Sequence, residues 1–208
     1  MAESIIIVDY DAGNLRSVQR ACQAVGVQAA ISSDPEAVRQ ADRVIFPGVG
    51  TAESAMTTLE ASGLDQALKS FANSGRPLLG ICLGLQVLLD HTDEGNRSCL
   101  GLIPGQCRRF EFADASFKVP QIGWNSAHQA VNHPVLTAVP DAAEFYFVHS
   151  FYAITARPEH VLAQTTFGDQ TFASVIGRDN IFATQFHLEK SGRFGLALLS
   201  AFAQWDGR

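Results

Sequence analysis

The run LGICLGLQ at residues 79–86 places a cysteine between two glycines, where an apolar segment ends. G-x-C-x-G between a strand and a helix is typical of a nucleophile elbow, the tight turn that lifts a reactive side chain out of a sheet. Gly80 and Gly84 let the strand and the helix approach closely, and the helix N-terminus favours a thiolate at Cys82. The pattern predicts a cysteine nucleophile, although a buried cysteine at an ordinary strand-to-helix turn gives the same pattern.

A cysteine nucleophile needs a base, and one of the six histidines stands out. His187 directly follows the apolar run 181–186, and Glu189 lies two residues further on. Side chains two residues apart on a strand point the same way, so we expect Glu189 to orient one ring nitrogen while the other faces Cys82. A histidine and a glutamate at this spacing are by themselves more often structural. Together with Cys82 they predict a Cys-His-Glu triad.

Acyl chemistry also needs hydrogen-bond donors for the oxyanion of the tetrahedral intermediate. The backbone N–H of Leu83, directly after the nucleophile, is one candidate. We expect the second donor from the loop Pro-Gly-Val-Gly at 47–50, through the amide of Val49 or Gly50, although Pro-Gly is common in any loop. Gln86 lies one helical turn after Cys82, and its amide could bind the polar groups of a substrate.

An alternation of strand and helix patterns predicts the sheet that must hold these residues. Strands are expected at 4–8, 28–31, 43–46 and 77–81. Helices are expected at 14–24 (capped by Asn14), 34–40 (capped by Asp34), 53–70 (with a break at 62–63) and 84–89. This order predicts an α/β fold, with an open, mostly parallel sheet and helices on both faces. The candidate residues follow the C-terminal ends of strands, where such sheets place their sites.

The second half of the chain has a different character. Short β-like runs occur at 109–112, 117–119, 145–148, 152–155, 161–166, 171–177 and 181–186. We expect them to add antiparallel strands to the edge of the parallel sheet, and a last helix at 190–205 to pack back onto it. No linker divides the chain, so a single domain over residues 1–208 is predicted.

The composition excludes several classes of protein. Hydrophobic residues make up 47% and charged residues 17%, so the chain can bury a core and disorder is not expected. The net charge of −6 argues against a nucleic-acid partner. Four cysteines without a C-x-x-C pair indicate neither a metal site nor a disulfide framework. With no membrane span or signal-like segment evident, we expect the protein in the cytoplasm.

In order and approximate spacing, PGVG at 47–50, GICLGLQ at 80–86 and QFHLEKS at 185–191 resemble the class I, triad-type glutamine amidotransferases. Three more stretches are similar to one branch of that family, the glutaminase subunits of imidazole glycerol phosphate synthases. They are DYDAGNLRSV at 9–18, KVPQIGWN at 118–125 and FYFVHSFY at 145–152. One departure is Leu188, where the family usually has proline.

The resemblance implies a role for each site residue. Cys82 is the nucleophile, His187 the base and acid, and Glu189 its orienter. Leu83, Val49 and Gly50 form the oxyanion hole. Glutamine is bound by Gln86, Ser150 and Phe151. No cofactor is implied.

The resemblance also implies a heterodimer with a (β/α)₈-barrel cyclase in histidine biosynthesis. Ammonia from glutamine passes into the cyclase, which makes imidazole glycerol phosphate and an aminoimidazole carboxamide ribotide. Candidate interface residues are Asn14, Arg16, Trp124, Tyr146 and Lys190, although each could also be a core or solvated residue.

Other functions compete with this interpretation. The stretches at 9–18 and 118–125 disfavour a subunit for anthranilate or aminodeoxychorismate synthesis, whereas a paralogue feeding a surface-sugar amidine pathway stays open. A cysteine peptidase or chaperone of similar fold often has histidine directly after the elbow cysteine, where this chain has Leu83. The presence of all three triad members disfavours a non-catalytic binding module.

Overall fold

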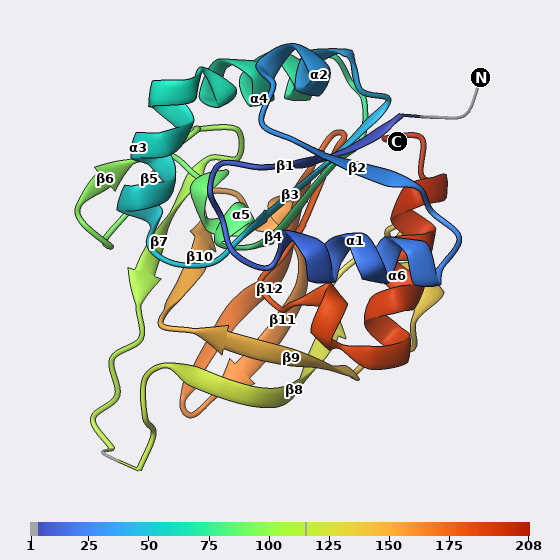
Figure 1. Ribbon diagram of the computed structural model, residues 1–208. Helices are drawn as coiled ribbons and strands as arrows, with labels where there is room; N and C mark the ends of the chain where they lie inside the picture. The colour runs from blue at the N-terminus through green and yellow to red at the C-terminus, as the bar shows by residue number, and fades with distance from the viewer. Residues whose placement is uncertain (1–3, 115) are drawn as a thin grey trace.

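The computed structural model describes residues 4–114 and 116–208 (Figure 1). Five parallel strands lie side by side in the order β2-β1-β3-β4-β13. Their bounds are Ala29–Ser32, Ile5–Val8, Arg43–Gly48, Leu78–Cys82 and Ile181–Thr184. The last of these strands comes from the far end of the chain, so the sheet brings residues near 82 and near 184 together.

Helices cover both faces of this sheet, which confirms the predicted fold class. Neighbouring strand residues such as Ile7 and Val8 point to opposite faces and enter separate apolar clusters. The cluster of Ile7 includes side chains of α1 (Leu15–Ala24) and α6 (Gly192–Gln204). The cluster of Val8 includes side chains of the helices on the other face, α2 (Pro35–Gln40), α3 (Ala52–Ser62) and α4 (Leu64–Ala72).

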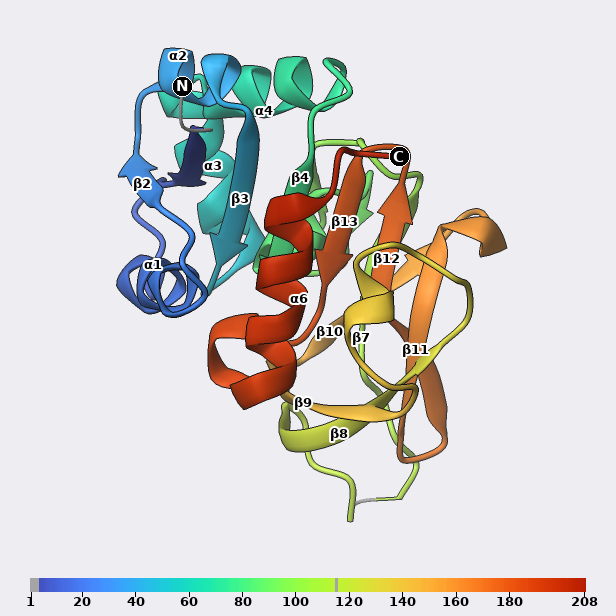
Figure 2. The ribbon, with the colours of Figure 1, turned by 90° about the vertical axis from the view of Figure 1, so that its right-hand side faces the viewer.

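The second half extends the sheet with antiparallel strands, as predicted (Figure 2). β12 (Gln170–Arg178) pairs with β13, and the sheet continues through β10 (Phe151–Thr155) to β7 (Gly105–Arg109) and the short strands β5 (His91–Thr92) and β6 (Arg97–Ser98). A branch leads from β12 through β11 (Val161–Phe167) and β8 (Gln121–Gln129) to β9 (Ala143–His149).

Two of the expected strands were wrong. Residues 110–112 and 117–119 form no strand, and β8 begins only at Gln121. Phe110, Phe112 and Phe117 instead pack against Phe167. Aromatic side chains that pack together from a loop give the same apolar sequence pattern as a strand.

Several helix boundaries also differ from the prediction. The break expected near residue 63 is confirmed, because Gly63 takes a left-handed φ of 74° between α3 and α4. The helix after Cys82 is only α5 (Leu83–Val87), and the last helix starts at Gly192, after a 3₁₀ turn at Leu188–Lys190. Among the described residues, no helix combines the length and apolar character that crossing a membrane requires.

Candidate active site

Cys82 occupies the predicted nucleophile elbow between β4 and α5. Its backbone has φ 55° and ψ −108°, a strained conformation for a residue with a side chain. A Cβ atom on Gly84 would lie 1.9 Å from the carbonyl oxygen of Phe46, so the elbow and β3 approach too closely for any side chain there. Cys82 is 6% exposed and lines a cleft.

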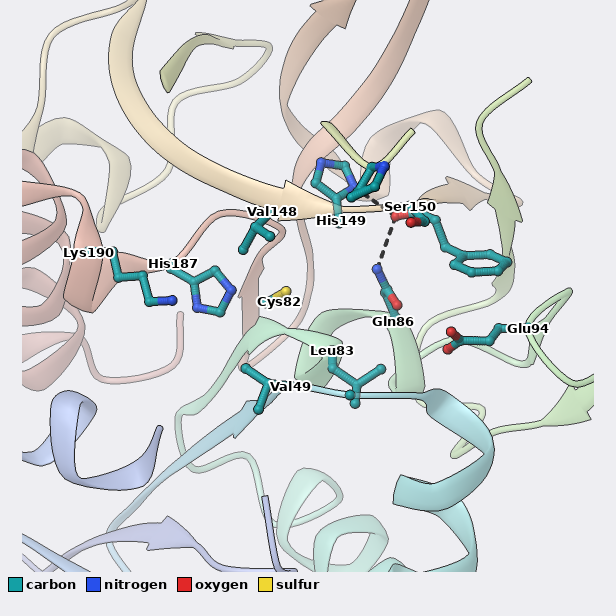
Figure 3. A pocket seen from close by; sticks show the side chains of 13 residues that line it. Val49, Cys82, Leu83, Gln86, Glu94, Val148, His149, Ser150, His187 and Lys190 are labelled. Atoms are coloured by element: carbon teal, nitrogen blue, oxygen red, sulfur yellow. Dashed lines mark hydrogen bonds between the residues drawn. The ribbon is translucent and has the colours of Figure 1, made fainter. Parts of the chain in front are cut away.

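The cleft has a volume of about 390 Å³ and collects most of the predicted site residues (Figure 3). The predicted residues that line it with Cys82 are Val49, Gly50, Leu83, Gln86, Ser150, Phe151, His187 and Lys190. They come from the ends of β3 and β4, from α5, from the junction of β9 and β10, and from the segment between β13 and the end of the 3₁₀ turn at Leu188–Lys190. Folding therefore brings together segments that lie more than 100 residues apart, and their catalytic and binding roles stay predictions.

His187 and Glu189 form a buried pair next to the nucleophile. The Nδ1 atom of His187 lies 2.7 Å from Oε1 of Glu189, and the two side chains are 2% and 0% exposed. The expected reason for this contact was wrong, because β13 ends at Thr184 and Glu189 lies in the 3₁₀ turn. The turn, not the two-residue period of a strand, folds the carboxylate back onto the ring. Leu188, where the family usually has proline, is buried in the core.

The surroundings of His187 favour its protonated form. Burial lowers the pKa of the ring, but the neighbouring Cys82 and Glu189 outweigh burial and raise the pKa to about 10. The Nε2 atom has no hydrogen-bond partner within the described residues that meets ordinary geometry, and the ring lies beside the sulfur of Cys82 (Figure 3). One nitrogen is thus held by a carboxylate, and the other is left for the reaction.

The carboxylate of Glu189 has a second contact, with Asn14. Asn14 was predicted to cap α1 and to lie at a partner interface, but its side chain makes no capping hydrogen bond. Its Nδ2 atom instead donates to Oε1 of Glu189, the oxygen that His187 also contacts. The backbone of Asn14 has a left-handed φ of 77°, which turns the side chain toward the triad.

The loop predicted to supply an oxyanion donor packs directly on the elbow. β3 runs through Gly48, which pairs with Cys82, and Val49 is 36% exposed at the mouth of the cleft. A Cβ atom on Gly48 would lie 2.2 Å from the hydroxyl of Tyr10 and 2.9 Å from Cβ of Leu83. The two candidate donor segments are therefore adjacent in the structure.

Gln86 is only partly available to a ligand. Its Nε2 atom donates to the carbonyl of Phe151 at 3.0 Å and to Oε1 of Gln185 at 3.2 Å. Its own Oε1 accepts no hydrogen bond from the described residues. The side chain can thus accept from an ammonium group, while its donors already hold the wall of the cleft.

Two residues beside the nucleophile were not among the predicted site residues: His149, which lines the cleft, and Gln185, which does not. Gln185 is fully buried, and its Nε2 atom lies 3.8 Å from the sulfur of Cys82. His149 bonds through Nδ1 to the carbonyl of Phe151 at 2.8 Å, and burial lowers the pKa of its ring to about 4. The sequence signal that could have identified them is their place in two motifs already named, since Gln185 lies in the motif at 185–191 and His149 in the motif at 145–152.

The other candidate interface residues occupy different places. Trp124 on β8 is 56% exposed and pairs across the strands with Tyr146 on β9. Lys190 lies with its ammonium 5.8 Å from the centre of the Tyr146 ring, at the rim of the cleft. Arg16 is exposed in the first turn of α1 and does not line the cleft.

The sequence is similar to a set of named bacterial proteins. It is 46% identical over 207 residues to "Imidazole glycerol phosphate synthase subunit HisH" of Nitrosococcus oceani, covering 98% of both chains. The protein of the same name from Desulfovibrio desulfuricans is 48% identical, with 97% of this chain and 94% of that one covered. "Imidazole glycerol phosphate synthase subunit HisH 1" of Pseudomonas aeruginosa is 43% identical over the whole of both chains.

Solved structures with much lower identity share the fold. PurLQS from Thermotoga maritima has a TM-score of 0.72 at 16% identity, covering 98% of this chain and 99% of that chain. A solved glutamine amidotransferase has a TM-score of 0.69 at 18% identity, covering 95% and 98%. The model of the glutamine amidotransferase class-I family matches residues 6–204. With the elbow, the cleft and the relatives together, the chain belongs to the class-I glutamine amidotransferases and, within them, to the imidazole glycerol phosphate synthase subunits HisH.

Proposed function

We propose that this chain is the glutaminase subunit of an imidazole glycerol phosphate synthase, acting in histidine biosynthesis through a Cys82-His187-Glu189 triad. The observation that carries the proposal is the position of the His187 ring, which lines the cleft beside the sulfur of Cys82 and is bonded through its other nitrogen to Glu189 (Figure 3). This geometry supports the roles of nucleophile, base and orienting carboxylate.

In the first half of the reaction, the thiolate of Cys82 attacks the δ-carbon of glutamine and forms a tetrahedral oxyanion. Backbone N–H groups at Leu83 and in the loop at Val49 and Gly50 donate hydrogen bonds to this oxyanion. His187 holds its second proton at neutral pH because of its raised pKa, and it passes the Nε2 proton to the leaving nitrogen. Ammonia leaves, and a thioester joins the glutamyl group to Cys82.

In the second half, the now neutral His187 takes a proton from water, and the resulting hydroxide attacks the thioester. The carbon–sulfur bond breaks, glutamate leaves and the thiolate returns beside the imidazolium. Glu189 keeps its hydrogen bond to Nδ1 throughout, so the ring presents Nε2 in both steps. Ser150, Phe151 and Gln86 line the same cleft and are proposed to hold the amino-acid end of glutamine.

The partner is proposed to be a (β/α)₈-barrel cyclase that receives the ammonia. Ammonia reacts as a nucleophile only while unprotonated, so it must reach the synthase by a route that excludes water. The relatives are named as subunits, which supports a partner. Ile122 and Trp124 on β8 are 64% and 56% exposed, and such side chains are common anchors in protein interfaces.

The decisive experiment replaces the nucleophile. Cys82→Ala is assayed for glutamate release in the presence of the cyclase and its nucleotide ligand, with Cys99→Ala as the matched control. Cys99 is a half-buried free cysteine that does not line the cleft. We expect Cys82→Ala to be inactive and the control to retain activity; substantial turnover by Cys82→Ala would end the proposal.

A separate measurement tests the partner surface. Trp124→Ala removes the largest exposed ring on β8, so we expect about 30-fold weaker binding to the cyclase, the effect of losing about 2 kcal/mol at an interface centre. Binding is followed by titration calorimetry. The same affinity for Trp124→Ala and wild type would exclude this strand from the interface.

A further inference from the structure

A chain of hydrogen bonds links the wall of the cleft to the sulfur of Cys82. The carbonyl of Phe151 accepts from Gln86, whose Nε2 also donates to Oε1 of Gln185. The Nε2 atom of Gln185 then lies 3.8 Å from the sulfur, within reach of an N–H···S hydrogen bond. Gln86 and Gln185 are 5% and 0% exposed, so water does not compete for these contacts.

The carbonyl of Phe151 sets which group donates and which accepts in each of these hydrogen bonds. A backbone carbonyl can only accept, so the amide of Gln86 must turn its NH₂ group toward Phe151. The same NH₂ group then faces Gln185, which must present its oxygen to it. The remaining NH₂ group of Gln185 is therefore directed at the sulfur of Cys82. Rotating either amide by half a turn would oppose donor to donor or oxygen to oxygen.

The segment after β13 places two polar side chains beside the same sulfur (Figure 3). Gln185 and His187 are two residues apart and both face Cys82. Phe186 between them points the other way and stacks on Phe145 in the core, with ring centres 3.9 Å apart. The anchored aromatic ring keeps the backbone on both sides in place, so both polar side chains stay on the side of the nucleophile.

We propose that Gln185 is a second hydrogen-bond donor to the reactive sulfur of Cys82, held in that role by Gln86 and Phe151. This inference rests on the proposed function, in which Cys82 is the nucleophile. A donor that is oriented before substrate binds stabilises the thiolate without reorganisation. Because Gln86 also lines the cleft, a ligand that draws Gln86 away from Gln185 would release this donor.

The experiment compares two buried glutamines. Gln185→Met keeps the size of the side chain and removes its donor, and Gln121→Met does the same at a residue of β8 that is 4% exposed and outside the cleft lining. The measurement is the ultraviolet absorbance of the thiolate as a function of pH, taken as the difference from the matching protein that also carries Cys82→Ser.

We expect Gln185→Met to lower the ratio of thiolate to thiol at Cys82 about tenfold or more, which displaces the titration curve upward by about one pH unit. His187, Tyr10 and Cys107 also interact electrostatically with Cys82, and they are the same in every variant. Gln121→Met should follow the wild-type curve. A Gln185→Met curve that superimposes on wild type overturns the inference.

A second variant covers the case in which Gln185→Met does not fold. Gln86→Met leaves Gln185 in place but removes the donor that sets its orientation, so we expect a displacement in the same direction. An unchanged curve for Gln86→Met then overturns the inference. The outcome for the proposed function is separate, because that proposal fails only if glutamine turnover survives replacement of Cys82.

Discussion

Replacing Glu189 by glutamine is the sharpest test of how the triad is held. The variant keeps the shape of the side chain and an oxygen that can still accept from His187 and Asn14. It removes only the negative charge next to the ring. Because that charge helps to raise the pKa of His187 to about 10, Glu189→Gln should lower this pKa and leave less imidazolium to protonate the departing ammonia.

The size of the effect follows from the geometry. The Nδ1···Oε1 distance is 2.7 Å, and both side chains are almost fully buried, so water screens the pair little. Hydrogen bonds to a charged group contribute about 1.5–3 kcal/mol. If this contribution acts fully in the transition state, kcat falls by about 10- to 150-fold, since about 1.4 kcal/mol corresponds to a factor of ten.

The assay is glutamate release with the cyclase and its nucleotide ligand present. Glu60→Gln is the matched control, because Glu60 pairs with Arg97 on the surface of α3. We expect an unchanged KM for Glu189→Gln, since the carboxylate orients the base and does not line the cleft. A kcat within about twofold of wild type, in a folded protein, would refute the role given to Glu189.

Three further predictions concern stability. The raised pKa of His187 predicts that the contribution of this residue to the free energy of unfolding is constant below pH 6.5 and falls by up to roughly 5 kcal/mol toward pH 10; in denaturant titrations His187→Asn should lose this alkaline dependence. The lowered pKa of His149 predicts the opposite sign, with roughly 3 kcal/mol lost as pH falls from 6.5 to about 4, and a flatter acid limb for His149→Asn. Gly84→Ala should destabilise the fold by about 3 kcal/mol or more in thermal unfolding, because its Cβ meets the Phe46 carbonyl, whereas an almost unchanged melting temperature would contradict this close approach.

The parallel half of the fold could be predicted closely from the sequence. Its strands are short, mostly apolar runs, and helix signals separate them, such as the Asp34 cap that accepts from the N–H of Glu36. The antiparallel half was harder, because Phe110, Phe112 and Phe117 share the composition of a strand but lie in a loop, from which their rings pack against one another. Backbone pairing depends on a partner strand, which a local pattern does not identify.

The sequence by itself predicted the residue types of the site, since a cysteine elbow and a distant His-x-Glu in one chain together indicate a catalytic triad. Only the tertiary structure decided how these residues are held. A 3₁₀ turn directs Glu189 back onto His187. The contacts of Asn14 with Glu189 and of Gln185 with the sulfur of Cys82 join residues distant in sequence. Such contacts depend on the packing of β13 against β4, and no local spacing encodes the side-chain directions that packing selects.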